Sequence, residues 1–191
     1  MSLFAALFMA ALLVTLIYGV MVYNSLVTVK HNVSKAWANI DVLLKQRHDE
    51  IPKLVEVCRQ YRQFEQATLQ KVIEARSHVF AASQQQNMPA LAQAETHLRA
   101  GLANLFAVAE AYPDLKTNER FSSLQTRISA LENAIADRRE FYNESVNINN
   151  VRIEQFPDVV VARMFDFPPR ELLEFQAADK ADVDVKQLFA A

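Results

Sequence analysis

The sequence predicts an all-α protein with an N-terminal transmembrane helix followed by an antiparallel helical bundle of about four long helices. Three observations support this prediction. No charged residue occurs before Lys30. Apolar residues then recur at spacings of three and four as far as Ile153. Only two glycines occur in 191 residues, a composition typical of long helices with few tight turns.

Residues 1–29 are expected to form a membrane anchor. The stretch from Leu3 to Val22 supplies the roughly 20 apolar residues that a helix needs to cross a bilayer core of about 30 Å. Tyr23 and Asn24 then provide an aromatic and amide collar for the membrane interface. A cleaved signal peptide fits less well, because no basic residue precedes the stretch and no small-residue cleavage pattern follows it.

Basic residues follow the predicted span and none precedes it; they are Lys30, Lys35, Lys45 and Arg47. Because positively charged loops stay on the cytoplasmic side, we expect an outside N-terminus and a cytoplasmic body at a bacterial inner membrane. A body on the periplasmic side is the alternative. The single Cys58 excludes an intrachain disulfide and fits a reducing compartment.

Residues 30–155 are expected to form one helical bundle. The first apolar stripe continues directly from the span and comprises Val33, Trp37, Ile40 and Leu44. The second runs from Leu54 to Val72, the third from Leu91 to Tyr112 and the fourth from Leu124 to Ile153. Trp37 fits either a helix core or, being close to the span, the lipid headgroups.

Three breaks separate these helices. Asp49 is a suitable N-cap and Pro52 suits a first turn, so Pro52 either starts a new helix or kinks a continuous one. The polar run 83–89 separates the second helix from the third. The turn 112–116 contains Pro113, which ends the third helix before the longest stripe begins.

Residues 156–191 are expected to be an extended aromatic and proline-rich segment followed by a mobile acidic tail from Ala177 to Ala191. Three prolines interrupt the segment, and its aromatic residues are Phe156, Phe165, Phe167 and Phe175. Such rings must pack on the bundle or on a neighbouring copy. We therefore expect a homo-oligomer formed through the anchored helices and this segment, assisted by tethering to one membrane.

The sequence offers no constellation that indicates catalysis, a cofactor or a metal. It contains no Gly-rich phosphate loop, no C-x-x-C, no H-E-x-x-H and no G-x-S-x-G motif. None of the four histidines follows a Glu by three residues, as a di-metal bundle site requires. Cys58 is interpreted as a small core residue. The formal net charge of −2, without a basic stripe, argues against nucleic acid.

Several charged and amide residues lie close to the apolar stripes, where an unpaired charge would be costly. They are Glu65, Arg76, Glu110, Glu132, Arg138, Arg139 and Asn143. We interpret them as an interior network that fixes helix register, with a binding or proton-handling site as the alternative. Replacing Arg76 or Glu110 should cost about 3 to 5 kcal/mol if its partner is buried and about 0 to 1 kcal/mol if the pair is exposed.

Short motifs in a fixed order resemble the bacterial LemA family over residues 1–175. They include Tyr23-Asn24-Ser25-Leu26-Val27, Ala36-Trp37, Ile40-Asp41-Val42, Leu44-Lys45-Gln46-Arg47-His48-Asp49, Ile51-Pro52, Ala75-Arg76, Glu110-Ala111-Tyr112-Pro113-Asp114-Leu115-Lys116, Phe141-Tyr142-Asn143 and Phe156-Pro157. The resemblance implies a membrane-tethered antiparallel bundle and implies no enzymatic reaction. The family pattern usually has Asn where this chain has Lys53, and the tail after Phe175 falls outside it.

Two classes of function follow. The first is a non-catalytic scaffold of the bacterial envelope that binds itself or partner proteins whose identity the sequence does not specify. The second is a small-ligand sensor or an enzyme that uses interior polar residues. The missing nucleophile, metal and phosphate motifs favour the scaffold.

Overall fold

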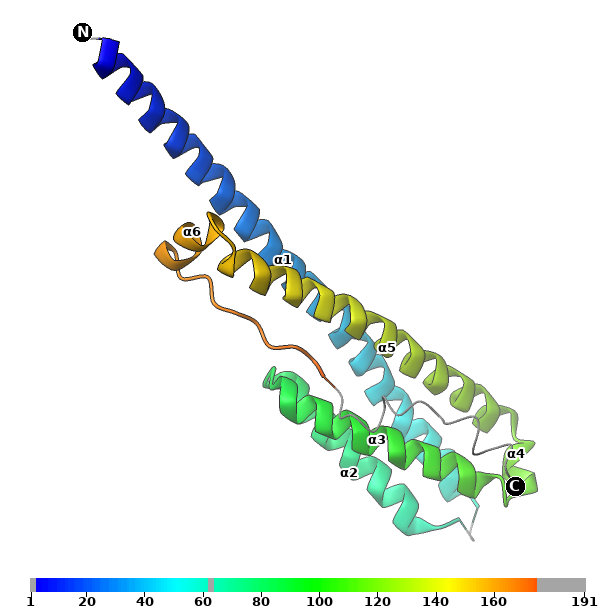
Figure 1. Cartoon of the computed structure of the whole chain (residues 1–191). Coiled ribbons are helices and arrows are strands. Elements are labelled where there is room, and N and C mark those ends of the chain that lie inside the picture. The colour runs from blue at the N-terminus through cyan, green and yellow to red at the C-terminus, as the bar shows by residue number, and fades with distance from the viewer. Residues whose placement is uncertain (1–2, 62–63, 175–191) are drawn as a thin grey trace, which may run out of the picture. The chain divides into compact units, whose positions relative to one another are not determined.

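The structure is a computed structural model that describes residues 3–61 and 64–174. Six helices occur in these residues (Figure 1): α1 (Leu3–Arg59), α2 (Gln66–Gln84), α3 (Met88–Ala109), α4 (Pro113–Lys116), α5 (Glu119–Glu154) and α6 (Asp158–Met164). No strand occurs in the same residues, and the predicted all-α class is confirmed. The predicted mobile tail from Ala177 to Ala191 lies outside the described residues.

The chain divides into two compact units, and both α1 and α5 contribute to each. Unit 1 comprises residues 1–42 and 135–172, and unit 2 comprises residues 43–134 and 173–191. The predicted boundary between anchor and bundle at residue 29 therefore falls inside a continuous helix.

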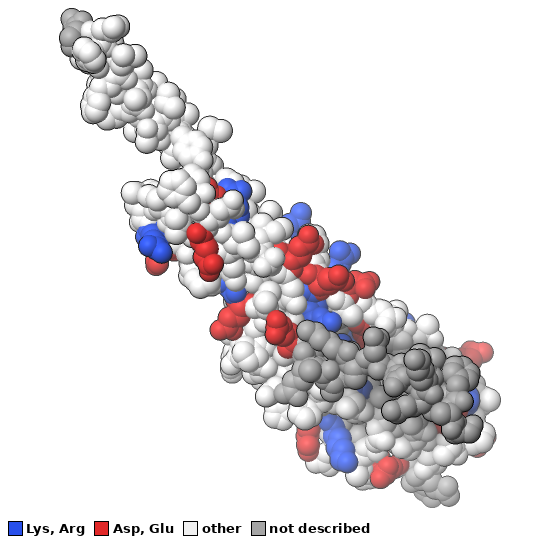
Figure 2. Space-filling view, viewed as in Figure 1, with Lys and Arg blue, Asp and Glu red and all other residues white. Residues whose placement is uncertain are grey.

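In unit 1, α1 and α5 run antiparallel. Arg152 Nη2 donates to Ser25 Oγ at 3.0 Å toward one end of the pair, and the rings of Trp37 and Tyr142 meet edge to face, 5.9 Å apart, toward the other. The N-terminal part of α1 is long and apolar enough to span a membrane, and none of its 18-residue apolar window is buried. Figure 2 shows this part without any charged side chain. It is a candidate membrane anchor.

In unit 2, α2 and α3 form an antiparallel hairpin. The chain reverses through residues 85–87, where Gln86 adopts a positive φ of 50°. The Asn87 side chain then caps α3 by accepting a hydrogen bond from the Ala90 N–H at 3.0 Å. The fully buried apolar side chains of this unit come from five helices and include Ile51, Leu54, Val72, Leu91, Leu98, Leu105, Leu115, Phe121 and Ile128.

The structure resolves the alternative at Pro52, because α1 continues through this proline to Arg59. The prediction of a second helix across residues 54–72 is therefore wrong: α1 ends at Arg59, and α2 begins at Gln66. Pro52 has no N–H to donate to the carbonyl of His48, four residues earlier. Arg76 Nε on α2 donates to that carbonyl instead, at 2.8 Å.

The region after Ile153 was expected to be extended, and this prediction is wrong for residues 158–164, which form α6. This stretch lies between Pro157 and the next prolines, Pro168 and Pro169. Pro157 occupies the N-cap position, and Asp158 places a carboxylate in the first turn. Residues 167–174 are not helical, as the sequence indicated.

Candidate functional site

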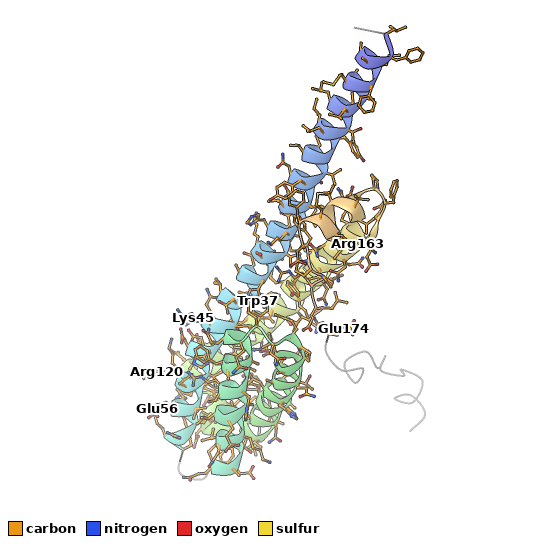
Figure 3. The ribbon with its side chains drawn as sticks, turned by 90° about the vertical axis from the view of Figure 1, so that its left-hand side faces the viewer. Trp37, Lys45, Glu56, Arg120, Arg163 and Glu174 are labelled. Carbon is orange, nitrogen blue, oxygen red and sulfur yellow. The ribbon has the colours of Figure 1, made fainter. Side chains whose placement is uncertain are left out.

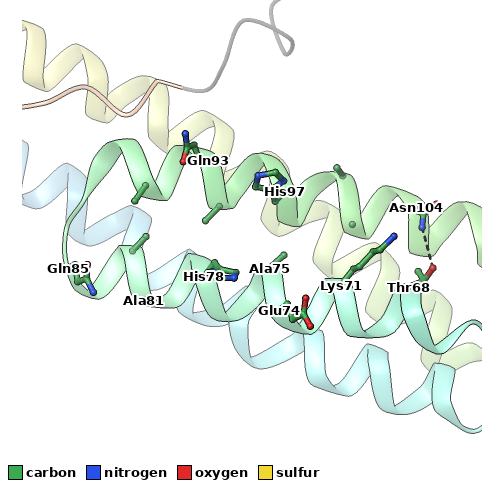
Figure 4. Close-up of a pocket in the computed structure, with 15 residues that line it drawn as sticks. Thr68, Lys71, Glu74, Ala75, His78, Ala81, Gln85, Gln93, His97 and Asn104 are labelled. Carbon is green, nitrogen blue, oxygen red and sulfur yellow. Dashed lines mark hydrogen bonds between the residues drawn. The ribbon is translucent and has the colours of Figure 1, made fainter.

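A groove runs along the α2–α3 hairpin in unit 2. Its volume is about 920 Å³, and its lining is drawn in Figure 4. Small residues from both helices contribute to it: Ala75, Ala81, Ala82, Ala90, Ala94, Ala100 and Gly101. A Cβ atom added at Gly101 would lie 3.4 Å from Val72 Cγ2, so the two helices pack closely here. The hairpin therefore presents a groove to which small side chains contribute from both helices.

Polar side chains border this groove from both helices. Lys71, Glu74 and His78 come from α2, while Gln93 and His97 come from α3, and all five are exposed (Figure 4). At one end, Asn104 Nδ2 donates to Thr68 Oγ1 at 3.3 Å. The border therefore carries both signs of charge next to an apolar surface, a combination that suits recognition of another protein.

A buried ion-pair cluster lies on another face of α3. Arg47 Nη1 donates to Glu132 Oε1 at 2.6 Å, and Arg47 Nη2 donates to Glu95 Oε1. Arg99 Nε lies 3.4 Å from Glu132 Oε2. Burial opposes the charge on Arg47, but the carboxylates of Glu95 and Glu132 outweigh it and raise the pKa of Arg47 above its ordinary value. The cluster thus joins three helices through charges that stabilise one another.

Arg47 and Glu95 are interior residues that were not predicted from the sequence. Arg47 was interpreted only as one of the basic residues that follow the membrane span. Its side chain is buried, with only 1% exposed. The apolar spacing contained a signal, because Arg47 shares one helical face with Leu44, Ile51 and Leu54. Glu95 in the same way lies between Leu91 and Leu98 on the buried face of α3.

The predicted interior network is only partly interior. Glu132 belongs to the buried cluster, and Arg76 is half-buried. Glu65, Glu110 and Arg138 are exposed, so the prediction of interior positions is wrong for these three. Glu65 precedes α2, and Glu110 follows the last turn of α3, where it pairs with Lys116 at 2.5 Å, so neither lies on a buried helix face.

Two further members of that set, Arg139 and Asn143, are half-buried on the unit 1 part of α5. Each makes an interaction of its own. They belong to a different unit from Glu132, so the predicted set does not form a single site within either unit.

Arg76 forms its hydrogen bonds with His48. Besides its bond to the His48 carbonyl, Arg76 Nη2 lies 2.5 Å from His48 Nε2. Burial and the Arg76 charge lower the pKa of His48, which favours the neutral ring that can accept this contact. Arg76 therefore links α2 to His48, a residue within the length of α1.

Cys58 is fully buried. Burial raises the pKa of its thiol to about 12, so the thiol stays protonated near neutral pH. The interpretation of Cys58 as a core residue agrees with this position. Within residues 3–61 and 64–174, no group of three or more His, Cys, Asp or Glu side chains is arranged to hold a metal ion.

The predicted aromatic contacts divide between packed and exposed rings. The Tyr23 ring lies 4.8 Å from Phe165 and 5.9 Å from Phe167, measured between centroids. Phe156 is exposed, and Phe175 lies outside the described residues. Phe165 and Phe167 therefore have a packing partner in their own chain, at the collar residue Tyr23.

The residues predicted to lie at the membrane interface, Tyr23, Asn24 and Trp37, do not lie at one level along α1. Asn24 is exposed beside Tyr23, and its carbonyl accepts a hydrogen bond from Thr28 Oγ1 at 2.9 Å. Trp37 packs on Tyr142, and a helix rising 1.5 Å per residue puts it about 22 Å beyond Val22. Of its two interpretations, the contact supports helix packing for Trp37.

Comparison with known proteins agrees with this description. The family model described as LemA family matches residues 36–187. The Protein LemA of Metamycoplasma hominis is 25% identical over 165 residues, which cover 86% of this chain and 74% of that protein. Two proteins of Paramagnetospirillum magneticum, Magnetosome protein MamQ 1 and Magnetosome protein MamQ 2, are each 23% identical over 190 residues, covering 87% of this chain and 70% of theirs. The chain belongs to the LemA family.

Proposed function

We propose that this protein is a membrane-anchored helical scaffold that associates with a second copy of itself through the groove of the α2–α3 hairpin. The observation that carries the proposal is the groove itself. Small side chains along its length allow the backbone of another helix to approach, and the apolar surface gains stability when it is covered. The proposed scaffold function involves no catalytic step.

The charges at the groove suit a symmetric pair. Most soluble homodimers have twofold symmetry, in which residue i of one copy meets residue j of the other and the reverse. Lys71 and Glu74 lie one turn apart on α2, both exposed beside the groove. A twofold pairing of two hairpins can therefore bring Lys71 of each copy toward Glu74 of the other, and anchoring in one membrane raises the effective concentration of the copies.

The polar groups of unit 2 support a structural interpretation over an enzymatic one. Arg47, only 1% of whose side chain is exposed, is held by two carboxylates, and the buried Cys58 is a protonated thiol. The histidines at the groove, His78 and His97, are exposed and come from opposite helices. A volume of about 920 Å³ is also within the range of small-molecule sites, so a ligand sensor using this groove is the second candidate.

Filling the groove should separate the copies. Ala81 and Ala100 are exposed groove residues on α2 and α3, so Ala81→Trp and Ala100→Trp can be accommodated in the free chain but occupy the space of a docked helix. We expect mass measurements of the full chain in nanodiscs to show a homo-oligomer for the parent and mainly monomer for both variants. Ala130→Trp, at an exposed position on α5 outside the groove, should leave the mass unchanged.

A monomeric parent chain in nanodiscs would exclude self-association. An oligomer of unchanged mass in both groove variants would place the contact elsewhere. The ligand-sensor alternative predicts that the mass does not depend on the groove variants.

We further propose that the body of the protein faces the cytoplasm of a bacterial cell, because the basic residues nearest the predicted span all follow it. The test uses Cys58→Ala with Gln85→Cys, since Gln85 is an exposed residue at the tip of the α2–α3 hairpin. We expect this thiol to resist a membrane-impermeant maleimide in intact spheroplasts and to react after the membrane is opened. Equal labelling before and after opening would place the body on the outer side.

A further inference from the structure

Unit 1 holds α6 against α1 at the point where the exposed apolar stretch ends. Val22 and Leu26 of α1 form a buried cluster with Ile153 of α5 and Ala162 of α6. The side chain of Phe167, after α6, packs against the same cluster. The short helix therefore has a fixed height along α1, set by the last turns of the candidate membrane span.

A polar contact fixes the same position from the other side. Arg152 Nε donates to Asp158 Oδ2 at 2.5 Å, and Arg152 Nη2 donates to Ser25 Oγ at 3.0 Å. Asp158, in the first turn of α6, is buried and has its charge matched by this arginine. The inward face of α6 thus packs on the apolar cluster, and its buried carboxylate is paired with Arg152.

Exposed apolar side chains lie on the outward side of α6 and its flanking turns. Val160 and Met164, four residues apart on α6, are 53% and 71% exposed, and Phe156, just before the helix, is 79% exposed. Phe165 is 55% exposed beside them, although its ring also contacts Tyr23. Removing side chains of this kind from water is favourable, and this gain is not realised while α6 faces water.

We propose that α6 and its flanking turns lie in the boundary between headgroups and acyl chains of the bilayer that α1 spans, so that unit 1 contacts lipid at a second place. The inference rests on the anchor in the proposed function. Its occupant is the phospholipid surface, because the apolar patch on α6 continues the exposed apolar surface of α1, where Val20 and Met21 are 53% and 64% exposed.

The depth of α6 follows from the helix geometry. About 20 residues rising 1.5 Å each match the roughly 30 Å hydrocarbon core, so a span from Leu3 to Val22 emerges where α6 is attached. Tyr23, which contacts Phe165, supplies the aromatic side chain typical of the membrane–water interface. The Lys30 ammonium, farther along α1 from the apolar stretch, lies 5.9 Å from the centroid of the Phe167 ring. Figure 3 shows Arg163 on α6 closer to the apolar end of α1 than Trp37 is.

The charges around α6 indicate which lipid property matters. Arg163 and Arg170 are exposed, but so are Glu154 and Asp166, and these charges cancel. Attraction to anionic lipid is therefore weak, and apolar burial is the main driving force. A zwitterionic phosphatidylcholine bilayer should be sufficient for the contact.

The test measures the depth of a fluorophore on the full chain, with one chain per phosphatidylcholine nanodisc. In a Cys58→Ala background, Met164→Cys carries an environment-sensitive fluorophore on α6, and Val160→Cys carries it in a second variant. Phe141→Cys is the matched control, because Phe141 is also an exposed apolar residue of unit 1 (51%) but lies about 18 Å from Ile153 along α5. Leu12→Cys, inside the apolar stretch, reports the anchor.

We expect lipids brominated near the headgroup end of the acyl chain to quench the probes at positions 164 and 160 and to leave the probe at position 141 unaffected. Lipids brominated near the chain end should quench the probe at position 12 most strongly. Quenching at position 12 without quenching at 164 and 160 would overturn the lipid contact and leave the anchor intact. Loss of quenching at position 12 would overturn the anchor, and this inference with it.

Discussion

Replacing Arg47 by Ala should destabilise unit 2 by about 3 to 5 kcal/mol, because Glu95 then remains as a buried charge without its partner. Only 1% of either side chain is exposed, so water cannot take the place of the arginine. Hydrogen exchange of α3 is a suitable measurement, because it reports on unit 2 directly. Tryptophan fluorescence would not, because the only tryptophan, Trp37, lies in unit 1. Protection of α3 should fall strongly in the variant.

Two controls separate the effect of charge from that of lost packing. Glu110→Ala removes a pair whose side chains are 59% and 63% exposed, and it should cost only about 0 to 1 kcal/mol. Arg47→Met with Glu95→Leu removes both buried charges and should restore much of the protection that Arg47→Ala loses. If Arg47→Ala cost no more than Glu110→Ala, the cluster would not contribute to stability as described.

Replacing Arg76 by Ala should cost about 1 to 3 kcal/mol, because it leaves the His48 carbonyl without its side-chain donor inside a helix. The effect should depend on Pro52. In a Pro52→Ala background, residue 52 regains an N–H that can donate to the same carbonyl, so Arg76→Ala should cost less there. A double-mutant cycle followed by hydrogen exchange of α1 and α2 measures this coupling.

The coupling between Arg76 and Pro52 should exceed about 0.5 kcal/mol, as for residues that share one partner. An equal cost of Arg76→Ala in both backgrounds would show that the arginine acts through the His48 ring alone. Arg76→Lys provides a further comparison, since a lysine keeps the charge but lacks the planar guanidinium that reaches the carbonyl and the ring together.

The sequence was sufficient for the fold class and for the long apolar helix that is the candidate anchor, because both depend on local patterns that repeat over many residues. It was not sufficient at Pro52. Local rules allow either a new helix or a continuous one there, and the deciding contact comes from Arg76, on a helix that follows a turn. The short helix α6 was missed for a similar reason: its seven residues carry too little periodicity to be distinguished from an extended segment.

The candidate site was harder to predict than the fold. Proximity to an apolar stripe suggested interior positions for Glu65 and Glu110, but both lie at helix ends, where the chain turns away from the core. Arg47 and Glu95 lie on the stripes themselves, and this more specific criterion would have found them. The α2–α3 groove depends on two helices approaching closely at Gly101, which no single stripe reveals.

The packing of α5 and α6 on α1 also constrains the order in which the parts of the protein can fold during synthesis. The bond between Ser25 and Arg152 joins residues 127 positions apart, so it cannot exist until most of the chain has been translated. The α2–α3 hairpin, whose Thr68–Asn104 bond spans only 36 positions, is complete much earlier. The N-terminal segment is made first, yet its partners in unit 1 are among the last described residues to be made, so unit 1 closes after the hairpin has had time to fold.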